Sequence, residues 1–169
     1  MLSQERLRLI FITGSHPNAT RSIPSIVQSA LDAGAPAIQL RAKEARTRDT
    51  VDLGRRLREL TKAANALLLV NDRFDVACAV GADGVHLGPD DVPVSAIRRI
   101  APKRFLIGAS TDQATEAQRL VSEGASYIGC GTVYPTSNKS DAGPTIGLAG
   151  LQAVVDAVGA IKKVNILNS

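Results

Sequence analysis

The chain has 169 residues, of which 44% are hydrophobic, 21% charged and 3% aromatic, and its formal net charge is +4. This composition is that of an ordinary globular protein with a sizeable core, which Ala, Val, Leu and Ile must fill because aromatic residues are scarce. Basic residues are not interleaved with aromatic side chains that could stack on bases, and no apolar run approaches a membrane span, so neither nucleic acid nor a membrane is expected as a partner.

Short aliphatic runs alternate with helical patterns along the chain. Aliphatic runs bounded by polar residues predict buried strands, and apolar residues spaced three and four apart predict helices. The expected strands are Leu7–Thr13, Ala37–Leu40, Leu67–Val70, Gly84–Leu87, Phe105–Gly108, Tyr127–Cys130 and a short Val164–Leu167. The expected helices are Ile23 to Gly34, Thr47–Ala64, Asp75–Val80, Val94–Ile100, Gln113–Glu123 and Leu148–Val158.

The strict alternation of strands and helices predicts an α/β fold with a parallel sheet and right-handed crossovers. The strands lack polar alternation, which fits a (β/α) barrel of the TIM type, while an open doubly wound sheet is the alternative. No Gly-x-Gly-x-x-Gly follows the first strand, so dinucleotide binding is not expected. We therefore predict one domain over residues 1–169, a (β/α) barrel with six to seven strands that is incomplete at its C-terminus.

Three polar residues alternate at the end of the second expected strand. Gln39, Arg41 and Lys43 would point to the same side. Three donors, two of them cationic, suit a phosphate or diphosphate. The alternative is a solvated rim without a ligand.

Carboxylates follow the next two strands. Asn71 and Asp72 come directly after the third expected strand, and Asp91 follows the fourth. Two carboxylates and an amide at one sheet edge would suit Mg²⁺, which often shares its oxygen ligands with a phosphate. The alternative is that Asp72 and Asp91 cap helices that begin near Phe74 and Pro93.

Two later segments also carry polar side chains. Ser110 and Thr111 follow the fifth expected strand, and Thr136, Ser137, Asn138 and Lys139 lie in a long loop over residues 131–144. A loop of this length in a compact domain is more often functional than inert. Ser110 or Thr111 could instead cap the next helix, and the loop could be inert. No Ser-His-Asp or Cys-His arrangement is present.

Five strings resemble the thiamine-phosphate synthase family, in the family's order and at close to its spacing. They cover the chain from about Leu9 to Leu151 and are highly specific only when taken together. The strings are Gln39–Lys43, Leu69–Arg73, Gly81–Gly88, Ile107–Thr111 and Gly129–Thr136.

The resemblance implies a barrel enzyme, a Mg²⁺-dependent transferase of thiamine biosynthesis. It would join hydroxymethylpyrimidine diphosphate to hydroxyethylthiazole phosphate and release diphosphate, with no protein nucleophile or general base. Carried over by motif, Asp72 and Asp91 would hold Mg²⁺. The substrate-binding residues would be Gln39, Arg41, Lys43, Asn71, Ser110 and Lys139 for the pyrimidine diphosphate, and Thr136, Ser137 and Asn138 for the thiazole phosphate.

The sequence departs from the family in three places. Pro89 and Asp90 replace an expected Gln and Glu, and Ser137-Asn138 stands where the family often has an acidic residue and Thr. After Gly159-Ala160 the family continues through a seventh and an eighth strand, whose loops bind the thiazole phosphate. Residues 161–169 stand there in this chain, which predicts exposed sheet edges, poor turnover, and either marginal stability or association into homo-oligomers.

Two other functions stay open at this point. A thiazole tautomerase would share the fold, although we would expect a His near Ser110, where there is none. A non-catalytic protein that retains the diphosphate half-site is the second. The N-terminus lacks the apolar segment of a signal peptide, so a cytoplasmic location is expected.

Overall fold

The computed structural model describes residues 4–14, 20–135, 144–159 and, for the backbone alone, 163–166. The chain forms two compact units, Met1–His86 and Leu87–Ser169.

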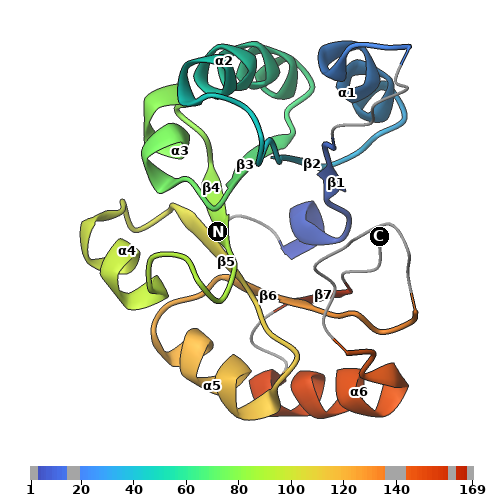
Figure 1. The fold of residues 1–169 in the computed structure, drawn as a ribbon, viewed down its shortest axis with the longest axis vertical. Coiled ribbons are helices and arrows are strands. Elements are labelled where there is room, and N and C mark those ends of the chain that lie inside the picture. Colours follow the sequence, from blue (N-terminus) through green and yellow to red (C-terminus); the bar gives the residue numbers. More distant parts are fainter. Residues whose placement is uncertain (1–3, 15–19, 136–143, 160–162, 167–169) are drawn as a thin grey trace. The chain divides into compact units, whose positions relative to one another are not determined.

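The first unit is built on parallel strands that follow one another in chain order. The strands are β1 (Phe11–Ile12), β2 (Ala37–Leu40), β3 (Leu67–Asn71) and β4 (Gly84–Leu87), the last ending at the boundary. The helices are the 3-10 helix η1 (Gln4–Leu7), α1 (Ile23–Asp32), α2 (Thr47–Ala63) and α3 (Phe74–Val80). Helices α1, α2 and α3 lie along one side of these strands (Figure 1).

The second unit repeats the pattern. Its strands are β5 (Leu106–Ser110), β6 (Tyr127–Cys130) and β7 (Lys163–Ile166), which pair in parallel and in chain order. Its helices are α4 (Val94–Ile100), α5 (Ala114–Ser122) and α6 (Gly147–Val158). Helices α5 and α6 pack against each other (Figure 1).

The order of the strands decides between the two predicted architectures. A doubly wound sheet reverses its strand order at a switch point near the first strand. Strands β1 to β4 show no such reversal, because each pairs with the next one in the chain. The prediction of a (β/α) fold of the TIM-barrel type is confirmed, and the doubly wound alternative is wrong.

Most predicted elements are present within two residues of their expected bounds, but the first strand is not. The aliphatic run Leu7–Thr13 begins in η1, whose turn is closed by a hydrogen bond from Arg8 N to Glu5 O of 3.2 Å, and only Phe11–Ile12 pair as β1. Leu7 is buried, whereas Leu9 is 57% exposed. The run therefore serves two elements rather than one buried strand.

Buried strands form the centre of each unit. All residues of β2, and all of β3 except Asn71, are buried, and Ile38, Leu68 and Leu69 are fully enclosed. Gln39 is the one polar side chain in this apolar layer of β2, with 3% of its surface exposed. A buried amide requires hydrogen-bond partners, so neighbouring groups must supply those of Gln39.

Asp83, which precedes β4, joins α2 to β3. Its Oδ2 accepts hydrogen bonds from Leu68 N at 2.8 Å and Arg58 Nη1 at 2.7 Å, and its Oδ1 accepts from Arg58 Nη2 at 3.2 Å. The side chains of Arg58 and Asp83 are only 18% and 26% exposed. Removal of this carboxylate therefore leaves a mostly buried cation and a buried N–H without their acceptor.

We expect Asp83→Ala to lower the free energy of unfolding by about 2–3 kcal/mol, measured by urea denaturation. The matched control is Asp52→Ala, because Asp52 pairs with Arg55 at 3.6 Å and both side chains are 64% exposed. That change should cost less than about 0.5 kcal/mol. Equal losses in the two variants would contradict a stabilising role for the Arg58–Asp83 pair.

The buried phenol of Tyr127, in β6, should make the stability of the protein depend on alkaline pH. The side chain is 1% exposed, and burial raises the pKa of its phenol. The unfolded chain releases this proton near pH 10, while the native protein retains it. The stability that depends on the neutral phenol of Tyr127 is therefore fully present below about pH 10, and it decreases as the pH rises further.

The chain has two tyrosines, so a Tyr134→Phe variant isolates the absorbance of Tyr127. We expect no phenolate absorbance before the protein unfolds, and both signals then change together. Gradual ionisation near pH 10 in a protein that is still folded would contradict this prediction.

Candidate functional site

The ends of β2 and β3 bring together most of the polar residues predicted for the first unit. Gln39 belongs to β2, and Arg41 and Lys43 follow its last residue. Asn71 ends β3, and Asp72 comes directly after it. The polar side chains thus lie where parallel strands present their carboxyl ends, the usual position of a ligand site in this architecture.

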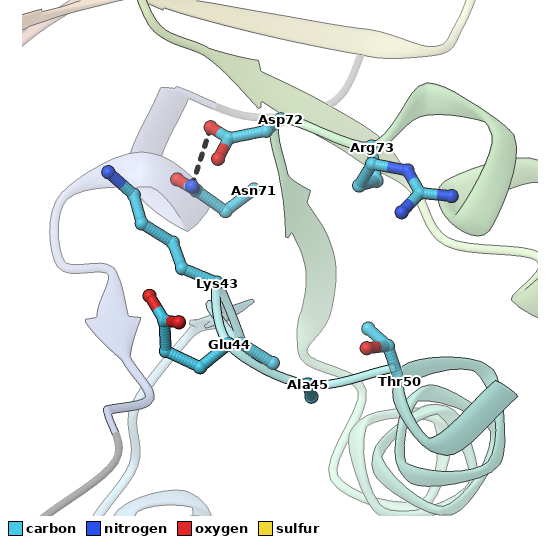
Figure 2. A pocket seen from close by; sticks show the side chains of 8 residues that line it. Lys43, Glu44, Ala45, Thr50, Asn71, Asp72 and Arg73 are labelled. Carbon is cyan, nitrogen blue, oxygen red and sulfur yellow. Dashed lines mark hydrogen bonds between the residues drawn. The ribbon is translucent and has the colours of Figure 1, made fainter. Parts of the chain in front are cut away.

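A chain of hydrogen bonds joins three of these side chains. Gln39 Nε2 donates to Asn71 Oδ1 at 2.7 Å. Asn71 Nδ2 in turn donates to Asp72 Oδ1 at 2.6 Å, the bond drawn as a dashed line in Figure 2. Because Asn71 accepts with its oxygen and donates with its nitrogen, the orientation of its amide is fixed at both ends. The buried Gln39 therefore reaches, through Asn71, the carboxylate of Asp72.

The backbone of Asp72 adopts an uncommon conformation. Its φ is 62°, in the left-handed region, and its N–H donates to His86 O at 2.8 Å. The left-handed region costs a non-glycine residue on the order of 1 kcal/mol, although Asp and Asn adopt it more readily than most. The turn and the amide of Asn71 together determine where the carboxylate lies.

The alternative that the two predicted metal ligands are helix caps is wrong. The N-cap residue of α3 is Arg73 and that of α4 is Pro93, so neither Asp72 nor Asp91 occupies an N-cap position. Asp91 instead accepts a hydrogen bond from Gly88 N on its Oδ2 at 2.6 Å. That bond closes the turn after β4 and leaves the carboxylate with further acceptor capacity.

A cavity of about 420 Å³ opens between the β2–α2 and β3–α3 connections. It brings together Lys43, Asn71 and Asp72, three of the residues predicted from the sequence (Figure 2). Gln39 and Arg41 are not among the lining residues, but Gln39 is hydrogen-bonded to the lining residue Asn71, and Arg41 directly precedes the lining residue Ala42. The sequence patterns gave no role to the other lining residues, which are Ala42, Glu44, Ala45, Thr50 and Arg73.

Arg73 forms one wall of this cavity and is held by its neighbours. Its Nε and Nη2 donate to the carboxylate of Asp75 at 2.9 and 2.6 Å, and its Nη1 donates to Thr47 Oγ1 at 3.2 Å. The guanidinium of Arg73 lowers the pKa of Asp75, which keeps the pair charged at neutral pH. Arg73 thus fastens the β3–α3 connection to the start of α2. Its position directly after Asn71-Asp72 is the signal that could have identified it.

Arg41 is fixed at its backbone by a residue that no sequence motif singled out. Thr13, which follows β1, accepts a hydrogen bond from Arg41 N on Oγ1 at 2.9 Å, and its hydroxyl donates to Arg41 O at 3.3 Å. Thr13 is buried. No local pattern connects two residues that lie 28 positions apart.

The second unit holds Asp91 and Ser110. Ser110 is the last residue of β5 and pairs with Gly129 of β6, so it belongs to the strand and not to the loop. The N-cap residue of α5 is Gln113, whose N–H donates to Thr111 Oγ1 at 3.1 Å. The alternative that Ser110 or Thr111 is the N-cap is therefore wrong, although Thr111 does support the turn before the helix. The predicted Thr136, Ser137, Asn138 and Lys139 lie outside the described residues.

Within the described ranges, no cluster of three or more His, Cys, Asp or Glu side chains could hold a metal by itself. Mg²⁺ is commonly held by one or two carboxylates together with oxygens of a bound phosphate, and such a site does not need a cluster of three. No helix in the described part is long and apolar enough to span a membrane.

Comparisons with known proteins show the family to which the chain belongs. The sequence model of the family described as thiamine monophosphate synthase matches residues 9–166. The thiamine-phosphate synthase of Pyrococcus horikoshii is 46% identical over 157 residues, which are 92% of this chain and 72% of that protein. The enzyme of the same name from Moorella thermoacetica is 46% identical over 133 residues, or 79% of this chain and 63% of its own length, just under two thirds.

A solved structure gives the same result. The thiamine phosphate pyrophosphorylase from Pyrococcus furiosus superposes with a TM-score of 0.83 and 40% sequence identity, covering 97% of this chain and 76% of that one. The similarity in sequence and fold thus extends over nearly the whole chain. The chain belongs to the thiamine monophosphate synthase family.

Proposed function

We propose that the chain is a transferase that makes thiamine phosphate. It joins hydroxymethylpyrimidine diphosphate to hydroxyethylthiazole phosphate and releases diphosphate. The observation that carries this proposal is the hydrogen-bonded series Gln39–Asn71–Asp72 beside Lys43, at the strand ends of a chain that belongs to this family. The choice of small-molecule substrates is supported by the names of its relatives.

Gln39, Arg41 and Lys43, together called the diphosphate clamp, would bind the diphosphate of the first substrate. A departing diphosphate gains negative charge, which two preorganised cations stabilise more strongly than water can. Asn71 would orient the substrate together with Gln39. In the reaction the bond between the pyrimidine methylene carbon and oxygen breaks, and its electron pair leaves with the diphosphate. The electron-rich aminopyrimidine supports the resulting carbocation until the thiazole nitrogen bonds to it.

Mg²⁺ is the cofactor that we propose, with Asp72 and Asp91 as its ligands. Both are hard oxygen donors, and each carboxylate accepts a hydrogen bond of 2.6 Å that sets its orientation, from Asn71 Nδ2 and from Gly88 N respectively. Carboxylates accept about four hydrogen bonds or metal contacts, so these bonds leave capacity for a cation. When bound, Mg²⁺ would neutralise charge on the diphosphate.

Further contacts complete the proposal. Ser110 and Lys139 would contact the pyrimidine diphosphate, and Thr136, Ser137 and Asn138 the thiazole phosphate, as the family motif implies. A single domain, a cytoplasmic location and association into homo-oligomers are proposed on the sequence features described above.

The test supplies both substrates to the folded protein and measures thiamine phosphate and diphosphate as Mg²⁺ is varied. We expect both products in equal amounts and only when Mg²⁺ is present. Calorimetry with the pyrimidine diphosphate, run in parallel, distinguishes a catalyst from a protein that only binds diphosphate. Failure to release diphosphate at every Mg²⁺ concentration would refute the enzymatic function.

A further inference from the structure

Thr13 holds both backbone groups of Arg41. The hydroxyl of Thr13 is acceptor for Arg41 N at 2.9 Å and donor to Arg41 O at 3.3 Å. A backbone N–H and C=O at the end of a strand need partners, which the neighbouring strand normally supplies. Here one side chain supplies both.

The ladder between β1 and β2 shows why a side chain is needed. Phe11 and Ile12 pair with Ile38 and Gln39, and directly after β1 the backbone N–H of Thr13 donates to Gln39 O at 2.9 Å. Beyond this point the hydroxyl of Thr13 takes over and extends the pairing to Arg41. The exit of β2 is thus held in a strand-like position for one residue more.

The turn after Arg41 makes this position consequential. Ala45 N donates to Ala42 O at 3.2 Å, and the turn that this bond closes carries Lys43 into the cavity. An unrestrained backbone at Arg41 would let its guanidinium occupy many positions, and ordering it on binding would reduce affinity. Thr13 is 4% exposed, so its hydroxyl has little access to water and depends on these two bonds.

We propose that Thr13 is a positioning residue that preorganises Arg41 for a diphosphate. The inference rests on the proposed function, because it assumes that Arg41 belongs to the diphosphate clamp. Thr13 itself need not contact the ligand. Its effect on diphosphate binding should therefore pass entirely through Arg41.

The experiment is a double-variant cycle with calorimetry, using inorganic diphosphate and Mg²⁺ as the probe. Thr13→Val replaces the hydroxyl with a methyl group of similar size, and Thr13→Ser keeps the hydroxyl. Thr13→Val removes both hydrogen bonds to the backbone of Arg41. We expect it to weaken diphosphate binding about five- to tenfold, the range of one hydrogen bond lost between Arg41 and the ligand, and Thr13→Ser to stay within about twofold. In an Arg41→Met background, Thr13→Val should cause no further loss.

The matched control is Thr61→Val, since Thr61 is fully buried and its hydroxyl donates to Arg58 O at 3.2 Å, at the far end of α2. This variant also loses a buried hydroxyl, so it reports any general effect of that change on stability. We expect its diphosphate affinity to match that of the unmodified protein. If Thr13→Val does not fold, Thr13→Ala removes the same hydroxyl without placing a methyl group against the backbone.

The outcomes separate the inference from the proposed function. The positioning role is refuted, and the diphosphate clamp stands, if Arg41→Met weakens diphosphate binding while Thr13→Val does not. The same conclusion follows if the double variant loses affinity by the product of the two single losses. If Arg41→Met itself leaves binding unchanged, the proposed role of Arg41 is refuted and this inference with it. Loss of affinity in Thr13→Ser equal to that in Thr13→Val would also refute it, because the hydroxyl would not be the cause.

Discussion

Replacement of Asp72 by Asn is expected to lower kcat/KM for the pyrimidine diphosphate by about 100- to 1000-fold, the range found when one preorganised group that stabilises transition-state charge is removed. The same variant should unfold at nearly the temperature of the unmodified protein. If Asp72 is a ligand of Mg²⁺, its replacement should cause a large loss of activity with little loss of stability.

The structure makes Asn the most informative substitution at this position. Asp72 has a φ of 62°, and Asn adopts that left-handed conformation as readily as Asp. The side-chain oxygen of Asn can still accept the hydrogen bond from Asn71 Nδ2, which is 2.6 Å long in the unmodified protein. The variant therefore keeps the backbone and the geometry of the amide, and loses only the negative charge.

The matched control is Asp75→Asn, which removes a carboxylate three residues further along the chain, in the first turn of α3. Asp75 pairs with Arg73 at 2.6 Å, and its side chain is 65% exposed. We expect that change to leave the Mg²⁺ requirement unaltered. Titration of activity with Mg²⁺ checks both variants, and unchanged Mg²⁺ dependence in Asp72→Asn would refute its role as a ligand.

Local patterns in the sequence predicted those parts of the fold that depend on them. Helix α2 and strands β2, β4 and β6 were predicted to within one residue, because each is a continuous apolar or amphipathic run bounded by polar residues or Gly. The first strand was wrong because an aliphatic run does not reveal which of its side chains are buried. Leu7 is enclosed and Leu9 is not, and tertiary packing decides the difference.

The candidate site likewise has residues that local motifs identify and contacts that only the tertiary structure reveals. The motif strings identified Lys43, Asn71 and Asp72, which the structure places around one cavity. The bond between Gln39 and Asn71 spans 32 positions in the chain, and that between Thr13 and Arg41 spans 28. Pairings of this kind depend on which strands are neighbours, so periodicity and spacing could not predict them.

Gly108 lies in the middle of buried strand β5, directly opposite Tyr127 of β6. A Cβ at Gly108 would lie 2.1 Å from Cζ of Tyr127, 2.4 Å from its hydroxyl oxygen and 2.5 Å from Cε1. Tyr127 is 1% exposed, so its ring has little room to move aside. Glycine within a strand weakens it and often marks a close approach, and here the approach is that of the tyrosine ring.

We expect Gly108→Ala to lower the free energy of unfolding by about 3 kcal/mol or more, at the upper end of what overpacking costs, because either the ring or the strand must be displaced. Gly81→Ala is the control, since Gly81 has a φ of 63° and a Cβ there would meet no atom within 4 Å. That variant measures backbone strain without a clash and should cost about 1 kcal/mol. Urea denaturation followed by circular dichroism measures both.

A second substitution tests the cause. Tyr127→Leu removes the ring and should destabilise the protein by itself, because it leaves a cavity in the core. In that background Gly108→Ala should cost much less, since the added methyl group then enters space that the ring has vacated. A coupling energy of about 2 kcal/mol between the two positions is expected, whereas additive losses would show that the strand, and not the ring, rejects a side chain at Gly108. The close contact between Gly108 and Tyr127 would, on the expected result, explain why an otherwise aliphatic strand carries a glycine just before the segment that presents Ser110.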